Sequence, residues 1–471
     1  MNKMRRMVWM SALLLVSLCG YSQELYMTGL LPDDGRYDKL PCKYELRSQD
    51  YNSLPSSYSL KRYCPVPKSQ GGFGTCVGWA TAYAARTIAE AVRLNMTDQA
   101  RINKEAFSPL FVYAQIKHSG DDDCQHGTRI DEALQLMKQM GAVKFESFNM
   151  LCADNVSQQL KNIAQIYKIT DFYTLFNNNE LFHFTINKVK KVKKAISQNN
   201  PVIISFNSYP SFHKAGEVWN GDDNDSYRRH ALCVVGYDDH KYGGAFQIMN
   251  SWGTSWGDNG FTWIKYRDFE KHVNQAFEMF VKKFDINSIR NPIMPSLPKL
   301  SGSILLRQPN GSSVRANYNQ QQKVYKASSQ SGQGSRYCID ITNKEPSYIY
   351  VIGIDSRNRA QRVFPANDYV SAAVTYPNSH ISIPSEDSYL PAPNSSDGYK
   401  RLCVLFSQDA LDFDKVIRDM NANVRAESFA QRLGTGTSNL MVPMSRINYT
   451  PNTISANAQT DKGFIPVIID L

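Results

Sequence analysis

Apolar residues recur at three- and four-residue spacing in two stretches of the first half of the chain. One stretch follows the glycine-rich sequence GGFGT, and the other follows Cys124 and ends before Gly141. Such spacing places apolar side chains on one face of a helix, so it predicts amphipathic helices that begin near Cys76 and near Ile130. The apolar positions are Val77, Ala80, Ala84, Ile88 and Ala91 in the first stretch, and Ile130, Ala133, Leu134 and Met137 in the second.

Continuous apolar runs in the middle of the chain predict buried strands instead. The run Ala231–Val235 directly follows His230, and a second run covers Phe246–Met249. Both runs are short, which suits a strand better than a helix. Upstream, the sequence VKKAISQNNPVIISF (192–206) predicts a helix, a stop at its Asn-Asn-Pro, and a further buried strand.

After residue 299 the pattern changes to short β-like runs separated by clusters of Gly, Asn, Ser and Pro. Repeated short strands of this kind are typical of a β-sandwich or barrel. One helix is expected over Ala410–Ala426. The strand candidates are Ser303–Arg307, Arg336–Thr342, Tyr348–Ile354, Ala360–Phe364 and Lys400–Phe406.

Length argues for several domains, because 471 residues exceed one ordinary domain. The first residues combine basic side chains, an apolar core and small residues, which predicts a secretory signal peptide cleaved after Ser22. We therefore expect an exported protein, extracellular or periplasmic, with no transmembrane segment. The predicted divisions are a signal peptide (1–22), an N-terminal extension (23–57), a first domain (58–284), a proline-bearing linker (285–299) and a β-rich accessory domain (300–471).

The net charge and the charge clusters add little to this prediction of domains and export. The formal net charge is +10, and removing three basic residues with the signal peptide leaves 10 − 3 = +7. The lysines within 188–194 alternate with apolar residues at helical spacing, which indicates a solvated helix face rather than a nucleic-acid site. Acidic clusters at 121–123 and 222–225 lack the ligand spacing of a calcium loop. We expect no nucleic-acid partner, no metal and no cofactor.

Three separated blocks carry groups suited to thiol chemistry: QGGFGTCVGWA (70–80), HALCVVGY (230–237) and NSWGTSWGDNG (250–260). The nucleophilic form of a cysteine is its thiolate. Cys76 stands at a predicted helix start, where unpaired N–H groups and the helix dipole favour a negative charge. An imidazole can take the thiol proton and pass it to a leaving amine, and we assign this role to His230. The side-chain amide of Asn250 can fix the orientation and tautomer of that ring.

These blocks, in the order Gln, Cys, His and Asn, resemble the papain-like family of cysteine peptidases over residues 58–283. The resemblance implies an α+β fold with a helical lobe and a β-barrel-like lobe, followed here by the β-rich, sandwich-like domain. It also implies peptide hydrolysis through attack by Cys76 and an acyl-enzyme. In that family Gln70 would donate to the oxyanion hole, Trp252 would shield the Asn–His hydrogen bond, and Gly127 would offer backbone hydrogen bonds to an extended substrate.

Several features depart from the family pattern. Val77 follows the nucleophile where Trp is common, and Arg229 precedes His230 where an acidic or amide residue is usual. Phe73 replaces a family cysteine, so the usual disulfide to Cys124 cannot form. No long helical propeptide is recognisable between the predicted signal peptide and the enzyme.

The cysteines other than the nucleophile are expected to be structural. Nine cysteines less one in the signal peptide leave eight, and with Cys76 free the remaining seven cannot all pair internally. A helix that folds back on its loop could bring Cys152 to Cys124, and this is the pairing we predict. Cys233 reads as a buried free thiol, and Cys338 and Cys403 could pair or could both be core residues.

The segment SYIYVIGIDSRNRAQRVFP (347–365), with the later ISIPSEDSYL and LCVLFSQDALDF, resembles an uncharacterised domain, domain of unknown function 4384. It shows no catalytic constellation, so we expect an accessory module able to bind a partner or a surface. The whole chain is thus expected to be a secreted bacterial cysteine endopeptidase acting on proteins or peptides.

Two alternatives to hydrolysis stay open. One is an acyl transferase or ligase on the same fold, although relatives that perform transglutamination carry Asp where this chain has Asn250. The other is an adhesion or binding protein that uses the fold only as a platform.

Overall fold

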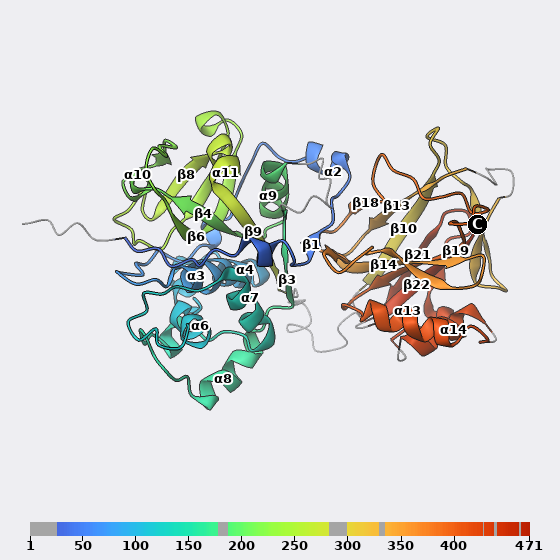
Figure 1. Cartoon of the computed structure of the whole chain (residues 1–471), viewed down its shortest axis with the longest axis horizontal. Helices are drawn as coiled ribbons and strands as arrows, with labels where there is room; N and C mark the ends of the chain where they lie inside the picture. Colours follow the sequence, from blue (N-terminus) through green and yellow to red (C-terminus); the bar gives the residue numbers. More distant parts are fainter. Residues whose placement is uncertain are drawn as a thin grey trace, which may run out of the picture.

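The computed structural model describes residues 26–177, 187–281, 299–328, 335–426, 428–437, 440–460 and 463–471. The predicted signal peptide and all of the predicted linker except Lys299 lie outside these ranges. A first body of helices and strands stands beside a second body made mainly of strands (Figure 1). None of the described helices has the length and apolar character needed to span a membrane.

The helical lobe of the first body is built around one continuous helical run. It starts with α3 (Cys76–Gly78), passes through a stretch of π-helical geometry, η2 (Trp79–Arg86), and ends with α4 (Thr87–Arg93). All five apolar positions predicted for this run are buried. The second predicted helix is α7 (Ile130–Gln139), and α6 (Pro109–Ile116) begins where the Ser108 side chain accepts a hydrogen bond from the Phe111 amide.

The β lobe contains the strands at one end of a long mixed sheet. The strand order of this sheet is β16-β1-β3-β9-β4-β6-β7-β8-β5, and the β lobe holds β9 to β5. Its central strands are antiparallel neighbours, and their buried runs confirm the predicted strands. The bounds are β4 (Val202–Ser208), β5 (Val218–Trp219), β6 (Arg228–Asp238), β7 (Ala245–Met249), β8 (Phe261–Lys265) and β9 (Val273–Phe280). Helix α9 (Lys188–Ser197) precedes β4, as predicted.

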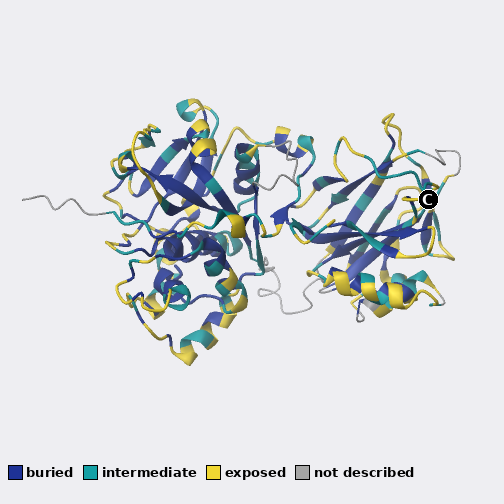
Figure 2. Ribbon diagram, viewed as in Figure 1, coloured by how far each residue is buried: buried dark blue, intermediate teal, exposed yellow. Residues whose placement is uncertain are grey.

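The second body contains two further sheets, in the orders β18-β13-β10-β21-β20 and β11-β12-β22-β19-β14-β15. A side chain on Gly302 of β10 (Lys299–Arg307) would overlap the ring of Phe406 in β19 (Tyr399–Ser407), so the two sheets pack face to face. Much of the strand length in both sheets is coloured as buried in Figure 2. The other bounds are β11 (Ala316–Asn319), β12 (Val324–Ala327), β13 (Cys338–Asn343), β14 (Ser347–Asp355), β15 (Ala360–Phe364), β17 (Ala373–Val374), β18 (Ser379–Ile383), β20 (Asn448–Tyr449), β21 (Ser455–Gln459) and β22 (Phe464–Asp470).

The predicted C-terminal helix is shorter than expected. Helix α13 (Phe413–Ala422) starts after Asp412, whose side chain accepts a hydrogen bond from the Lys415 amide. This N-cap fixes the start of the helix three residues after the predicted Ala410. A second helix, α14 (Phe429–Gly436), lies beside it along one side of the second body (Figure 1).

The N-terminal residues 26–53 connect the two bodies, which the sequence pattern did not reveal. They contain α1 (Asp34–Tyr37), β1 (Cys42–Lys43) and α2 (Ser48–Asn52). Strand β1 pairs in parallel with β3 (Asp171–Thr174) of the first body and with β16 (Val370–Ser371) of the second. One sheet therefore runs from the β lobe through the N-terminal segment into the second body.

A buried ion pair lies at this junction. Lys43 Nζ is 2.9 Å from Glu278 Oε2, and it also donates to Thr375 Oγ1 at 2.6 Å. The hydroxyl of Tyr376 donates to the same Glu278 oxygen at 2.7 Å. Burial lowers the pKa of Lys43, although the Glu278 carboxylate opposes that shift. The N-terminal segment, the first body and the second body thus each supply a partner to one polar cluster.

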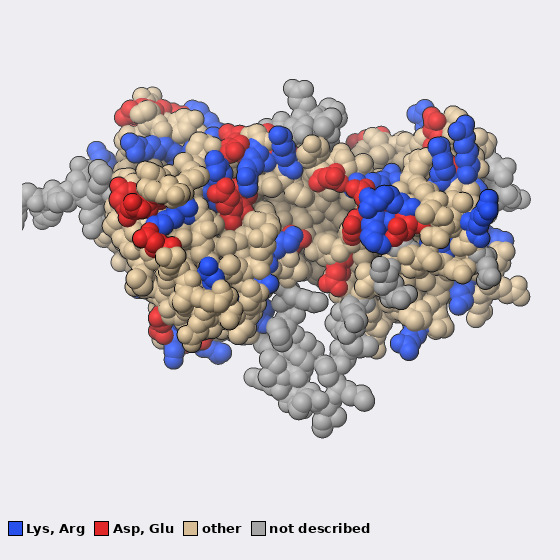
Figure 3. Space-filling view, turned by 60° about the horizontal axis from the view of Figure 1, so that its bottom comes forward, with Lys and Arg blue, Asp and Glu red and all other residues tan. Residues whose placement is uncertain are grey.

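Surface charge elsewhere is mixed. On the face shown in Figure 3, Lys and Arg side chains lie among Asp and Glu side chains in small clusters of both signs. An exposed ion pair lies on α13, where Lys415 Nζ is 2.6 Å from Asp419 Oδ2. Such pairs contribute little to stability, because water screens them.

We predict that Glu278→Gln lowers the free energy of unfolding by about 3–5 kcal/mol, because it leaves the buried Lys43 ammonium without its counter-charge. Urea-induced unfolding of the full chain measures the loss. The matched control is Asp419→Asn in the exposed pair, for which the change should stay below about 0.5 kcal/mol. Equal small changes in both variants would contradict a structural role for the junction.

Candidate active site

Cys76 is the first residue of α3 and is fully buried. The loop before it is held by the Gly74 amide, which donates to the Cys124 carbonyl at 2.7 Å. The predicted position of this thiol at a helix N-terminus is therefore observed. The unpaired amides there favour a thiolate over a thiol once solvent reaches the site.

His230 and Asn250 meet on neighbouring strands. His230 lies near the start of β6, Asn250 follows the end of β7, and His230 Nε2 is 2.9 Å from Asn250 Oδ1. The indole of Trp252 stacks on the imidazole, with ring centroids 4.7 Å apart. Because Asn250 Oδ1 also accepts from the Ser251 amide, it acts as an acceptor and leaves the Nε2 proton on the imidazole. The other nitrogen, Nδ1, has no hydrogen-bond partner within the described ranges, Cys76 included.

Gln70 is held rigidly beside the thiol. Its Oε1 accepts from Ser251 Oγ at 2.6 Å, and its backbone amide donates to the Ser251 carbonyl at 2.8 Å. Its Nε2 is thereby aimed outward, and it donates to the Phe73 carbonyl at 2.7 Å and to the Met27 carbonyl at 3.0 Å. Gln70 can therefore donate to a carbonyl oxygen that lies in the cleft.

The cleft is occupied by the chain's own residues 26–31, which we call the cleft segment. The Gly29 amide donates to Cys76 Sγ at 3.2 Å. Upstream, the Met27 carbonyl accepts from both Gln70 Nε2 and Trp252 Nε1, and the Tyr26 ring stacks on Trp252 with centroids 4.8 Å apart. Sequence reasoning missed this contact, because six residues without periodicity carry no signal of where they dock.

The cleft segment pairs with the loop that carries the predicted substrate-binding Gly127. The Thr128 amide donates to the Gly29 carbonyl at 2.9 Å, and the Leu31 amide donates to the Thr128 carbonyl at 2.9 Å. The bridge between Leu30 and Thr128 is parallel. Gly127 adopts a positive φ of 78°, and a side chain there would overlap the Gly29 carbonyl. The glycine thus permits the close approach of an extended peptide.

Burial under the cleft segment removes the charges of both catalytic candidates. Burial raises the pKa of the Cys76 thiol to about 11, although the backbones of Ala231 and Gly29 oppose the shift. Burial lowers the pKa of His230 to about 4, opposed by its hydrogen bond to Asn250. Between these values the thiol and the imidazole are both neutral. The interaction of the thiol with the Ala231 backbone also places Cys76 beside the residue that follows His230.

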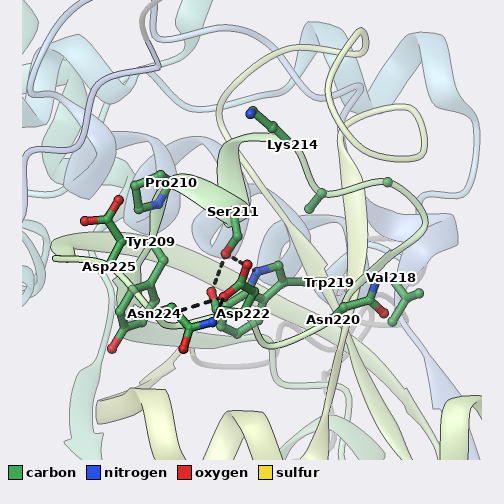
Figure 4. Close-up of a pocket in the computed structure, with 12 residues that line it drawn as sticks. Tyr209, Pro210, Ser211, Lys214, Val218, Trp219, Asn220, Asp222, Asn224 and Asp225 are labelled. Carbon is green, nitrogen blue, oxygen red and sulfur yellow. Dashed lines mark hydrogen bonds between the residues drawn. The ribbon is translucent and has the colours of Figure 1, made fainter.

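A hollow beside helix α10 (Pro210–His213) is lined by none of the predicted site residues. Its volume is about 640 Å³, and Tyr209, Trp219 and Asp222 are among the residues that line it (Figure 4). The Trp219 indole donates to Ser211 Oγ at 3.0 Å there. Its lining residues include no thiol and no imidazole.

The structure tests the predicted pairing of several cysteines. Cys124 and Cys152 form the predicted disulfide, which ties the loop before α7 to the segment after it. Cys233 is a buried free thiol, as predicted. Cys338 and Cys403 are also buried and unpaired, on β13 and β19, so the core alternative holds for both.

Parts of this chain are similar to known proteins and families. The family described as papain family cysteine protease matches residues 62–280, and domain of unknown function DUF4384 matches residues 332–410. Peptidase 1 of Euroglyphus maynei is 24% identical over 258 residues, which are 52% of this chain and 73% of that protein. Peptidase 1 of Dermatophagoides pteronyssinus is 26% identical, over 44% of this chain and 60% of that protein. Xylellain, a cysteine protease from Xylella fastidiosa, matches 54% of this chain and 96% of its own, with 21% identity and a TM-score of 0.44.

The fold and the family match define a cysteine protease with a papain-like, two-lobed α+β domain. Residues 62–280 match the papain family of cysteine proteases and form a papain-like cysteine peptidase domain, and residues 332–410 match a domain of unknown function.

We predict that Gly29→Ala exposes Cys76, because the added methyl group would overlap the Gly74 carbonyl and expel the cleft segment. An overpacking cost of about 1–3 kcal/mol corresponds to labelling of Cys76 by an epoxide probe that is roughly 5- to 150-fold faster. Thiolate absorbance in the ultraviolet at neutral pH should appear with it, since exposure removes the burial that raises the thiol pKa. Gly72→Ala is the control, because open space surrounds that position. Unchanged labelling in Gly29→Ala would show that the cleft segment does not limit access.

Proposed function

We propose that this protein is a secreted bacterial cysteine endopeptidase that hydrolyses peptide bonds through Cys76, His230 and Asn250, with Gln70 in the oxyanion hole. The observation that carries the proposal is the His230–Asn250 hydrogen bond of 2.9 Å beneath Trp252, with the thiol beside Ala231. Export rests on the basic and apolar character of residues 1–22.

The proposed catalytic role of each residue follows from the hydrogen bonds that its atoms already make. Asn250 holds Nε2 of His230, so Nδ1 is the nitrogen left to take the proton of Cys76 and deliver it to the leaving amine. The thiolate attacks the scissile carbonyl carbon and forms an acyl-enzyme, and water, deprotonated by the same imidazole, releases the acid. The Met27 carbonyl oxygen marks the place for the developing oxyanion, 3.0 Å from Gln70 Nε2.

The protein in this arrangement is latent. The thiol accepts a hydrogen bond from the Gly29 N–H, which is not electrophilic. A substrate must take the place of the cleft segment before attack can occur. Removal of the cleft segment would also expose the thiol and the imidazole to solvent, and the neutral state of each group depends on its burial.

Acyl transfer to an amine instead of water remains a second candidate on the same site. It needs an acceptor amine held near the acyl-enzyme, and no observation in the described residues favours one. The platform alternative is disfavoured, because a pure scaffold has no need for a buried, oriented imidazole beneath an indole and a rigidly held amide donor.

We predict different losses for the two partners of the imidazole hydrogen bond. In the Gly29→Ala background, His230→Ala should reduce kcat by about 10²–10⁴-fold, because the acid–base group is lost. Asn250→Ala should lose less, since it orients the ring and takes no proton. Steady-state hydrolysis of fluorogenic peptides measures both.

Two controls accompany this comparison. Cys76→Ala should abolish hydrolysis and probe labelling together. His213→Ala removes the other imidazole near Trp252, at 4.9 Å between ring centroids, and should cost far less than His230→Ala. Hydrolysis that persists in Cys76→Ala would sink the proposal, and equal losses in His230→Ala and Asn250→Ala would contradict the division of roles.

A further inference from the structure

An acidic side chain next to the cleft segment sits in a pre-built carboxylate site. Asp34, the first residue of α1, accepts from Arg229 Nη2 at 3.0 Å and from Gln275 Nε2 at 2.8 Å. The guanidinium is fixed on its other side, because Arg229 Nη1 donates to Ser205 Oγ at 3.0 Å. Ser205 and Gln275 are buried, and the Arg229 side chain is only 11% exposed.

The position of this site follows from the sheet register. Arg229 directly precedes His230 on β6. On β4, Ser205 pairs with Ala231, the residue whose backbone interacts with the Cys76 thiol, and on its other side it pairs with Gln275 of β9. The carboxylate site therefore begins one residue away from the proposed catalytic groups.

The site also opens toward the path of the cleft segment. A hollow of about 490 Å³ is lined by Tyr227, Arg228 and Arg229 on the β lobe, and by cleft-segment residues on the other side. The cleft segment runs past Cys76 to Leu30 and Leu31 and reaches Asp34 three residues later. Asp34 thus occupies a place that a side chain of a bound peptide can reach along the same path.

Displacement of the Asp34 carboxylate would leave the arginine without its counter-charge. Within the described ranges Arg229 makes one ion pair, the one with Asp34. A fixed, mostly buried guanidinium with an open donor, next to an amide donor, matches a carboxylate far better than a neutral side chain. This position is also where the chain departs from the family pattern, in which an acidic or amide residue precedes the histidine.

We propose that Arg229 and Gln275 form a substrate subsite that selects an acidic side chain, Asp or Glu, and that Asp34 is its internal occupant in the latent protein. The proposal rests on the proposed peptidase function and adds the chemical class of its substrates. Arg229 binds substrate in this scheme and takes no part in proton transfer.

The first experiment measures binding without catalysis. The full chain carrying Gly29→Ala, Asp34→Asn and Cys76→Ser is titrated with a synthetic peptide copying residues 26–37, and with the same peptide with asparagine in place of Asp34. The aspartate peptide should bind about tenfold more tightly or better. Arg229→Gln should collapse this difference, whereas Arg228→Gln, which removes an exposed neighbouring arginine, should preserve it.

The second experiment measures selectivity. The full chain carrying Gly29→Ala and Asp34→Asn is assayed with fluorogenic peptides that differ by Glu or Gln at one position at a time on either side of the cleaved bond. One position should favour Glu by about tenfold or more in kcat/KM, mainly through KM, and Arg229→Gln should abolish that ratio while Arg228→Gln keeps it.

The outcomes separate the two proposals. Equal binding of the two copy peptides, or a Glu preference that survives Arg229→Gln, would overturn the subsite. A difference in binding with no Glu preference at any position would overturn its role in substrate selection. If no peptide is hydrolysed while the aspartate peptide still binds more tightly, the carboxylate site stands and the peptidase function falls.

Discussion

The chemistry of this protein depends on the exclusion of water from one thiol and one imidazole. Burial shifts the two pKa values in opposite directions, to about 11 for Cys76 and about 4 for His230, so each group loses its charged form. The cover that excludes water consists of backbone atoms from the cleft segment. The same few residues accept a hydrogen bond from Gln70, face the thiol with an N–H group and pair with the loop at Thr128.

This cover is continuous with the element that joins the two bodies. After the cleft segment the chain forms α1, whose Tyr37 hydroxyl accepts a hydrogen bond from the Ala276 amide of β9, and then β1, which is shared by both bodies. Farther along, Arg47 contacts Asp340 and Glu386, and Asp50 contacts His380. The N-terminal segment is therefore a structural part of both bodies. This arrangement gives the second body a role in holding the first residues of the described chain.

More of the fold than of the candidate site could be predicted from the sequence. The helix at Cys76, the strands that carry His230 and Asn250, and the sandwich-like strands after residue 299 all have a period or a continuous apolar run. The Cys124–Cys152 disulfide followed from a helix that folds back on its loop. The cleft segment and β1 had no such signal, because an extended peptide of a few residues takes its conformation from the partner to which it hydrogen-bonds. The meaning of Arg229 was likewise hidden, since its ligand comes from α1, far away in sequence.

The cleft segment, which pairs in parallel with the loop at Thr128, is covalently attached to the domain whose cleft it fills. This attachment determines how the segment can be lost from the cleft. A covalently attached ligand is present at an effective concentration set by its tether, in the millimolar range for short flexible connections. Its occupancy is therefore independent of how dilute the protein is. A single cut in the chain between the cleft segment and α1 would convert this ligand into a free peptide, whose occupancy falls with dilution. Occupancy of the cleft would then fall through mass action alone, without any change in the contacts that the six residues make.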